Sequence, residues 1–148
     1  MLFFITVLID QIIKYFVVKS NLCIPILTDW FNLIYVKNTG GMYGVLENNN
    51  TLFIIVSIIV IAVILSFLFC NKNNNSKTQT YLWQLVLAGG VSNLCDRIFR
   101  GFVVDFIQLK FFGVFNLADA CIVLGIIAIL LIEIKEFFKS GNYKKRSN

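Results

Sequence analysis

Four long apolar runs decide what this chain can fold into. Each approaches the roughly 20 residues that a helix needs to cross a bilayer. The runs are Leu2–Val18, Thr51–Phe69, Tyr81–Cys95 and Leu117–Ile134. Of the 148 residues 58% are hydrophobic and only 14% are charged, which a soluble domain of this length does not sustain. The sequence therefore predicts a mainly α membrane protein in one domain, 1–148, with four transmembrane helices at about 2–19, 51–70, 81–97 and 115–136.

The basic residues predict how these spans are oriented. Lys72 and Lys77 lie between the second and third runs, and five more basic residues follow the fourth run from Lys135 onward. The positive-inside rule places both regions in the cytoplasm, so that both termini and a tail over 139–148 are cytoplasmic. The first run lacks a basic leader and is interrupted by Asp10 and Lys14, so we expect it to be a span and not a cleaved signal peptide.

The segments between the spans on the outer side carry strand signals. Phe31–Lys37 alternates and is followed by the turn signal Asn38-Thr39-Gly40-Gly41. A second alternating stretch is Ile107–Phe111. We expect two short strands that pair into a small sheet on the outer membrane surface.

Several chemistries are excluded by composition. The chain has no histidine, which removes Ser-His-Asp and Cys-His catalysis as well as H-E-x-x-H zinc sites. Its four cysteines are scattered without a C-x-x-C, so we interpret them as small buried hydrophobic residues and not as a metal site or disulfides. The net charge of +5 gathers in the predicted cytoplasmic regions, which argues against nucleic-acid binding.

Two aspartates, Asp105 and Asp119, are the strongest candidates for functional residues, because an acid in or beside a bilayer costs free energy. Asp105 follows the third span and Asp119 begins the fourth, so both are expected at the outer face. Neighbouring carboxylates tend to share a proton, which suits one as base and the other as acid in the attack of water on an amide. The alternative is that each pairs separately with a cation. The candidates are Arg97, Arg100, Lys110 and Lys14. Charge chemistry alone leaves both hypotheses open.

Two further polar groups lie on helix faces. Asp10 and Lys14 have i, i+4 spacing, and we interpret them as a structural ion pair that fixes the first span against the outer segment. Asn93, Asp96 and Arg97 share a face near the outer end of the third span. There Asn93 and Arg97 offer donors to a peptide backbone, and Asp96 is expected to be an ion-pair residue.

A competing function is a non-enzymatic ion or proton carrier that uses Asp10, Lys14 and Asp119, because intramembrane ionisable residues also mark such paths. It is less favoured because the second run offers only two serines for a polar path and Asp105 lies outside a span. A structural assembly factor held by packing at Gly89-Gly90 would leave the outer acids unexplained.

Five motifs, read in order, resemble the bacterial lipoprotein signal peptidase family, also called signal peptidase II. They are Asp10-Gln11-Ile12-Ile13-Lys14, Asn38-Thr39-Gly40-Gly41, Gly89-Gly90-Val91-Ser92-Asn93-Leu94-Cys95-Asp96-Arg97, Val103-Val104-Asp105-Phe106 and Phe115-Asn116-Leu117-Ala118-Asp119-Ala120. They extend over nearly the whole chain. Ser92 departs from the glycine that is usual there, and Gly41-Met42 departs from an Ala-Ala-like pair.

The resemblance implies an intramembrane aspartyl endopeptidase with four helices and a small extracytoplasmic β-cradle. It implies that the chain removes signal peptides from diacylglyceryl-modified prolipoproteins by cutting before the lipidated cysteine, at the outer face of the bacterial cytoplasmic membrane. The implied partners are these prolipoproteins and membrane lipids, with no cofactor, metal or nucleic acid.

The resemblance also implies roles for individual residues. Asp105 and Asp119 match the catalytic dyad, and Asp10 and Lys14 match residues that support the site. The residues implied to bind substrate are Asn38, Gly90, Asn93, Arg97, Asn116 and Ala118.

Overall fold

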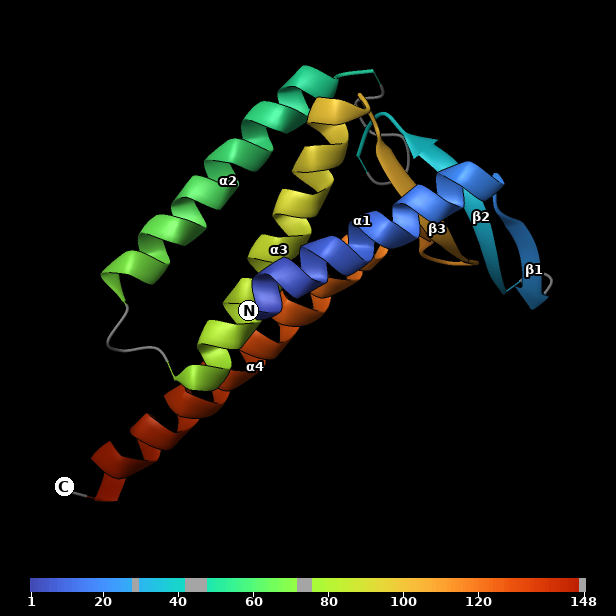
Figure 1. Cartoon of the computed structure of the whole chain (residues 1–148). Helices are drawn as coiled ribbons and strands as arrows, with labels where there is room; N and C mark the ends of the chain where they lie inside the picture. The colour runs from blue at the N-terminus through green and yellow to red at the C-terminus, as the bar shows by residue number, and fades with distance from the viewer. Residues whose placement is uncertain (28–29, 42–47, 72–75, 147–148) are drawn as a thin grey trace.

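The computed structural model describes residues 1–27, 30–41, 48–71 and 76–146, and within them the chain forms four helices and one small sheet (Figure 1). The mainly helical class and the antiparallel sheet confirm the predicted architecture in outline. The elements in chain order are α1 (Leu2–Ser20), β1 (Cys23–Leu27), β2 (Phe31–Asn38), α2 (Asn50–Cys70), α3 (Lys77–Phe99), β3 (Val103–Leu109), β4 (Gly113–Phe115) and α4 (Leu117–Arg146).

Helix ends differ from the prediction where side chains cap them. Helix α3 begins at Lys77, before the predicted position 81, because Ser76 and Gln79 form a capping box. In it the Ser76 hydroxyl accepts from the Gln79 N–H, and the Gln79 side chain accepts from the Ser76 N–H. Helix α4 begins two residues later than predicted and continues to Arg146, so most of the predicted tail is helical.

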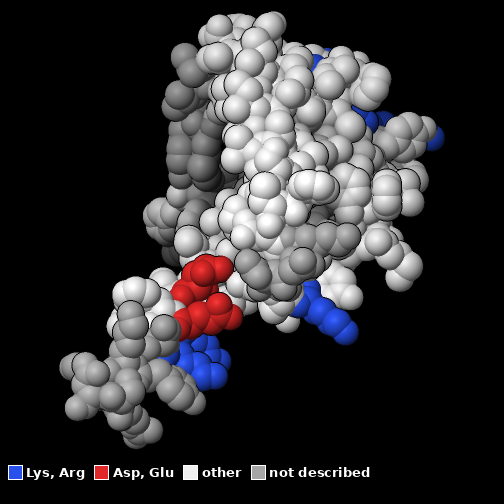
Figure 2. Space-filling view, turned by 90° about the vertical axis from the view of Figure 1, so that its left-hand side faces the viewer, with Lys and Arg blue, Asp and Glu red and all other residues white. Residues whose placement is uncertain are grey.

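Helix α3 is the centre of the bundle and packs against α1, α2 and α4 (Figure 1). By contrast α2 buries none of its residues, although its side chains are apolar all round. A helix of this kind is stable only in an apolar surrounding. By length and composition alone, α2 and the Leu117–Lys139 part of α4 are able to cross a membrane. Figure 2 shows a face that is largely uncharged, with charged side chains gathered toward its ends.

Glycines set the closest helix approach, between α3 and α4. A Cβ on Gly89 would lie 2.4 Å from the Ala118 carbonyl oxygen, and one on Gly125 would lie 2.7 Å from Val86 Cγ2. The predicted close approach at Gly89-Gly90 is thus confirmed for Gly89. Gly90 faces α2, where a Cβ would meet Ile61 Cγ1 at an ordinary 3.6 Å.

The sheet is antiparallel with the strand order β1-β2-β3-β4. The predicted strand Phe31–Lys37 is confirmed as β2. The prediction for Ile107–Phe111 is wrong in position, because the strand covers Val103–Leu109 and the chain turns at Lys110 and Phe111. The charge of Asp105 obscured the β-branched start of that strand.

The two outer strands were not predicted from the sequence. β1 contains Pro25, which is tolerated at a sheet edge, where its missing N–H breaks no ladder hydrogen bond. The other edge, β4, has only three residues, and it gains its strand character from pairing with β3.

Strand β3 separates a packed face from a cavity face. Val104 and Phe106 pack with Val17 of α1 in a small hydrophobic core. Because successive strand residues point to opposite sides, Val103 and Asp105 point the other way, into a cavity. The sheet therefore presents an acid to the cavity while its other face holds α1.

One interpretation of the sequence, that of the cysteines, is wrong in part, and two residues named from the sequence are not described by the structure. The four cysteines are free, but Cys23 and Cys70 are exposed, so the expectation that all are buried is wrong. Cys70 is the last residue of α2, whereas Cys23 begins strand β1. Met42 and Lys72 lie outside the described residues.

The α3–α4 contact gives a stability prediction. Gly89→Ala should lower the thermal unfolding temperature in detergent, because its Cβ meets backbone that cannot move without parting the helices. The expected loss is about 1–3 kcal/mol. Gly90→Ala is the matched control and should unfold near the wild-type temperature. Equal unfolding temperatures for the two variants would contradict this account.

Candidate active site

Asp105 projects from the middle of β3 into the cavity and is only 2% exposed. Its two oxygens accept hydrogen bonds from Asn38 Nδ2 at 2.8 Å and from Asn116 Nδ2 at 2.7 Å. The pKa of Asp105 is raised to about 6: burial is the largest cause, the nearby charge of Asp119 also raises the pKa, and the two amide donors and the charge of Lys14 partly oppose the rise. Asp105 thus changes its protonation state near neutrality.

Asp119 lies in the first turn of α4 and is held by that turn. The Asn116 side-chain oxygen accepts from the Asp119 N–H at 2.9 Å, and Asp119 Oδ2 accepts from the Asn116 N–H at 3.1 Å. This reciprocal pair satisfies two backbone donors that a helix start leaves free. Asp119 Oδ1 accepts from Asn93 Nδ2 at 2.8 Å, which ties the acid to α3.

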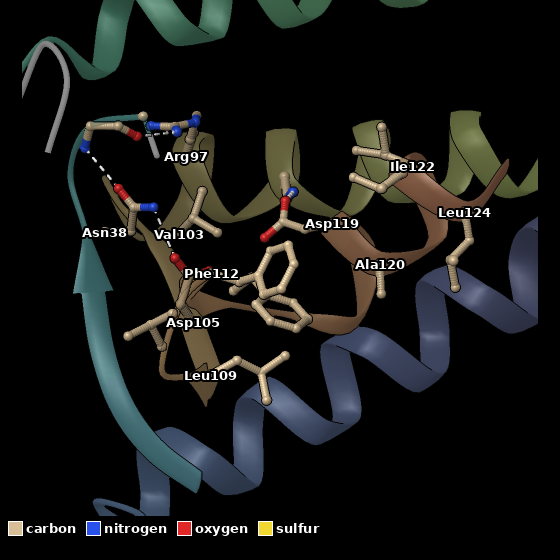
Figure 3. A pocket seen from close by; sticks show the side chains of 16 residues that line it. Asn38, Arg97, Val103, Asp105, Leu109, Phe112, Asp119, Ala120, Ile122 and Leu124 are labelled. Atoms are coloured by element: carbon tan, nitrogen blue, oxygen red, sulfur yellow. Dashed lines mark hydrogen bonds between the residues drawn. The ribbon is translucent and has the colours of Figure 1, made fainter. Parts of the chain in front are cut away.

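Asn116 joins the two acids. Its amide nitrogen donates to Asp105, and its amide oxygen accepts from the Asp119 backbone. Asp105 and Asp119 line the same cavity (Figure 3). Within the described part of the chain neither forms an ion pair, so the alternative that each is neutralised by its own cation is not supported.

Behind the two acids lies a buried charge cluster. Lys14 Nζ lies 2.8 Å from Asp10 Oδ2 and 3.0 Å from Asp96 Oδ2, and all three side chains are fully buried. Arg100 pairs with the other oxygen of Asp96. The predicted Asp10–Lys14 ion pair is confirmed, as is the ion-pair role of Asp96. The predicted partner of the pair is wrong: the pair fixes α1 against α3 and α4, not against the outer segment.

The cluster also fixes the backbone beside each candidate acid. Asp96 Oδ2 accepts from the Val104 N–H at 3.1 Å, one residue before Asp105. Asp10 Oδ1 accepts from the Ala118 N–H at 3.0 Å, one residue before Asp119. Lys14 also donates to Asn93 Oδ1 at 2.9 Å, which turns the Asn93 amide so that its NH₂ group meets Asp119.

Two residues of this cluster were assigned no role from the sequence. Gln11 donates to Ser92 and Asp96 and accepts from Arg100. Ser92, at a position where the family pattern has glycine, donates to Asp10 Oδ2 at 2.6 Å. Gln11 could have been found from the sequence, because it is a polar residue beside Asp10 on a predicted spanning helix. The role of Ser92 could not, because it depends on where the neighbouring helix α1 lies.

Arg97 lines the cavity and is held from outside α3. Its Nη2 donates to the Gly40 carbonyl at 2.8 Å, and its guanidinium lies 4.4 Å from the centre of the Phe53 ring. The Gly40 N–H in turn donates to Asn38 Oδ1 at 3.0 Å, the turn that the sequence predicted (Figure 3). Arg97 brings a fixed positive charge to a site with two carboxyl groups.

The cavity has a volume of about 600 Å³, within the usual range for ligand sites. It is bounded by the sheet, α3 and the first turns of α4. Five of the candidate residues beyond the two acids fall into two groups with respect to this cavity. Asn38, Asn93 and Arg97 line it along with Gly40 and Gly41, whereas Asn116 and Ala118 are buried behind its wall.

Comparisons with known proteins agree with one another. The family profile for signal peptidase (SPase) II matches residues 2–135. A lipoprotein signal peptidase of Halothermothrix orenii is 37% identical over 130 residues, which are 86% of this chain and 88% of that protein. A lipoprotein signal peptidase of Caldanaerobacter subterraneus subsp. tengcongensis is 40% identical over 139 residues, which are 91% of this chain and 92% of that protein.

Solved structures share the fold. One, described as a bacterial membrane enzyme at 2.3 Å resolution, superimposes with a TM-score of 0.81 at 26% identity, over 92% of this chain and 87% of that one. Another, at 1.9 Å resolution, gives a TM-score of 0.77 at 27% identity, over 90% of both chains.

The raised pKa of Asp105 predicts a pH-dependent stability. An acid with pKa 3.8 when unfolded and about 6 when folded stabilises the fold below pH 4, and this stabilisation is lost as pH rises through 6. Asp105→Asn, which stays neutral, should therefore gain stability relative to wild type between pH 4 and pH 7, by roughly 3 kcal/mol if the whole shift acts. Thermal unfolding of both proteins at the two pH values measures this, and a stability difference that does not change with pH would contradict it.

Proposed function

The chain belongs to the signal peptidase II family, and from this membership we propose that Asp105 and Asp119 are its catalytic pair. As a member it is a peptidase that removes signal peptides from prolipoproteins in a bacterial membrane. The carrier alternative explains neither this membership nor the pairing of Asp10 with Lys14, which leaves no free charge at that point of α1.

The observation that carries the proposal is the convergence of two acids from different elements on one cavity, joined through Asn116. One carboxylate takes a proton from the attacking water while the other, protonated, polarises the scissile carbonyl. The raised pKa of Asp105 supports the sharing of one proton at working pH. Asn38, Asn93 and Arg97 supply donors to the substrate backbone in the same cavity.

We propose further that the substrate is a diacylglyceryl-modified prolipoprotein cut before its lipidated cysteine. The reaction uses no metal or organic cofactor in this scheme, because the pair of acids supplies both proton-transfer roles. Asn116 and Ala118 act from behind the cavity wall: Asn116 orients both acids, and the Ala118 N–H donates to Asp10. Gly90 lies against α2.

The dyad proposal is tested by Asp105→Asn and Asp119→Asn. Each should lower cleavage of a diacylated prolipoprotein by at least about a hundredfold, because one carboxyl cannot serve as both base and acid. Glu133→Gln removes a carboxylate at the far end of α4 and should keep wild-type activity. Mass analysis of the products measures cleavage, and near-normal turnover by either asparagine variant removes that aspartate from catalysis.

We also propose that residues 1–148 form one membrane domain in which all four helices cross the bilayer. The 19 residues of α1 and the 23 of α3 are about 28 and 34 Å long, enough for the hydrocarbon core. Their charged residues Asp10, Lys14 and Asp96 are satisfied by each other and not by lipid. Lysines at the end away from the sheet support cytoplasmic termini and an outer-face site.

Single-cysteine labelling in cells tests this orientation, in a variant without the four native cysteines. Cysteines at the exposed positions 37, in β2, and 110, in the turn after β3, should react with a membrane-impermeant reagent added outside. Cysteines at positions 77 and 139 should react only after the cells are opened. The reverse pattern would place the candidate site on the cytoplasmic face.

A further inference from the structure

Helix α2 buries none of its residues and carries no charge, and yet its first turn reaches the candidate site. Asn50 and Phe53 both contact Arg97 of α3, and Arg97 lines the cavity (Figure 3). Residues with i, i+3 spacing lie on the same face of a helix, so both side chains come from one side of α2. This turn therefore makes a polar contact with the site that is unlike the apolar packing of the rest of the helix.

Three groups hold the guanidinium of Arg97. The Phe53 ring centre lies 4.4 Å from Cζ, within the range of a cation–π contact. The Gly40 carbonyl accepts from Nη2 at 2.8 Å, and Asn50 Oδ1 accepts a long bond from Nη1 at 3.5 Å. Asn50 Nδ2 also donates to the Arg97 carbonyl at 3.0 Å, which fixes α2 to the same residue. The ring contact uses the charge of the guanidinium and none of its N–H groups, so it restrains the side chain without occupying a donor.

Arg97 has strong electrostatic reasons to move toward the acids. It is only 8% exposed and lines the same cavity as Asp105 and Asp119. Its charge interacts with both of these acids and with Asp96 on its own helix, and Asp96 is already paired with two other cations. Within the described part of the chain Arg97 nevertheless forms no ion pair. In surroundings of low dielectric constant a guanidinium that is free to turn is drawn to a carboxylate. The contacts from α2 and from Gly40 therefore act against that attraction.

We propose that the first turn of α2 positions Arg97 for the reaction: Phe53 and Asn50 keep its guanidinium beside the two acids and prevent it from pairing with either. The inference rests on the proposed function, in which Arg97 is a donor to the substrate backbone. Held in this way, the guanidinium keeps N–H groups for a substrate carbonyl. Its charge also leaves Asp105 and Asp119 able to share a proton. Phe53 acts through Arg97, so it is a positioning residue and not a catalytic one.

The first test replaces Phe53 by monofluoro-, difluoro- and trifluorophenylalanine. Fluorine scarcely changes the size of the ring but removes negative charge from the ring face that attracts a cation. The kcat/KM for a diacylated prolipoprotein should fall with each added fluorine, to about a tenth of the wild-type value in the trifluoro variant. Phe53→Leu, which has no ring, should lose at least as much. Wild-type activity throughout the series would overturn the proposal, because a packing role tolerates fluorine.

Phe67 is the matched control. It also makes a ring contact from α2 to α3, with its centroid 5.5 Å from that of Trp83, but it does not line the cavity. Phe67→Leu and the same fluorinated residues at position 67 should keep the wild-type kcat/KM. Thermal unfolding in detergent is measured for every variant, and the trifluoro variants at the two positions should unfold within a few degrees of each other. Activity losses that are equal at both positions, or that follow the unfolding temperature, would mean a general packing effect and overturn the proposal.

The dependence of the rate on pH separates positioning from a loss of packing. A released Arg97 should move toward Asp105 and lower the pKa of that carboxyl, because a nearby positive charge favours the ionised form. Asp119 and Lys14 are the other charged groups that act on Asp105, and neither changes in Phe53→Leu. The alkaline limb of the profile should therefore move to lower pH by about one unit in this variant. A rate that falls by the same factor at every pH would contradict the proposal.

The proposed function and the positioning role fail in different ways. If the wild type cuts no diacylated prolipoprotein, the proposed function fails. If the wild type cuts it and the Phe53 series behaves like the Phe67 series, the positioning role alone fails. Cleavage by the wild type, together with a stepwise loss at Phe53 and none at Phe67, supports both.

Discussion

The buried ammonium group of Lys14 is the interaction on which the rest of the structure depends. A fully buried charge is tolerated only when it is paired, and removal of one partner typically costs about 3–5 kcal/mol. Lys14 bonds both Asp10 and Asp96, and these carboxylates hold the backbone N–H groups of Ala118 and Val104. One side chain of α1 thereby sets where β3 and α4 begin, and each proposed catalytic aspartate is the next residue along.

The four aspartates at the site fall into two pairs that receive different kinds of donor. The carboxylates of Asp10 and Asp96 are paired with cations and backbone N–H groups, so they have a structural role. Among the described residues, the donors to Asp105 and Asp119 are neutral amide and backbone groups, which orient a carboxyl group without neutralising its charge. A buried acid of this kind destabilises the ionised fold, and the raised pKa of Asp105 is the expression of that cost. Such strain is common where a site is built for proton transfer.

The way in which the helices pack together follows from their lipid surroundings. Without a hydrophobic driving force between helices, association rests on close packing and on polar contacts. Gly89 and Gly125 supply the close packing between α3 and α4, and the Lys14 cluster supplies the polar contacts between α1 and α3. Helix α2 contacts α3 through large side chains such as Phe67 against Trp83, and its first residue, Asn50, donates to the Arg97 carbonyl.

The helices, β2, the turn at Asn38 and the candidate acids could all be predicted from the sequence, because each depends on local pattern: apolar length, alternation, or an acid that lipid would not tolerate. The edge strands, the placement of Asp105 within β3 and the roles of Gln11 and Ser92 could not. The placement of Asp105 and the roles of Gln11 and Ser92 depend on partners far along the chain, such as Asn38 for Asp105 and Arg100 for Gln11. The edge strands form only through their pairing with β2 and β3. The sequence by itself thus determined which residues are candidates for the chemistry, since a charge in an apolar chain is visible locally. Only the tertiary structure decided the surroundings of each acid. Whether a carboxylate is held in a structural ion pair or is able to exchange a proton depends on the donors that the fold brings to it.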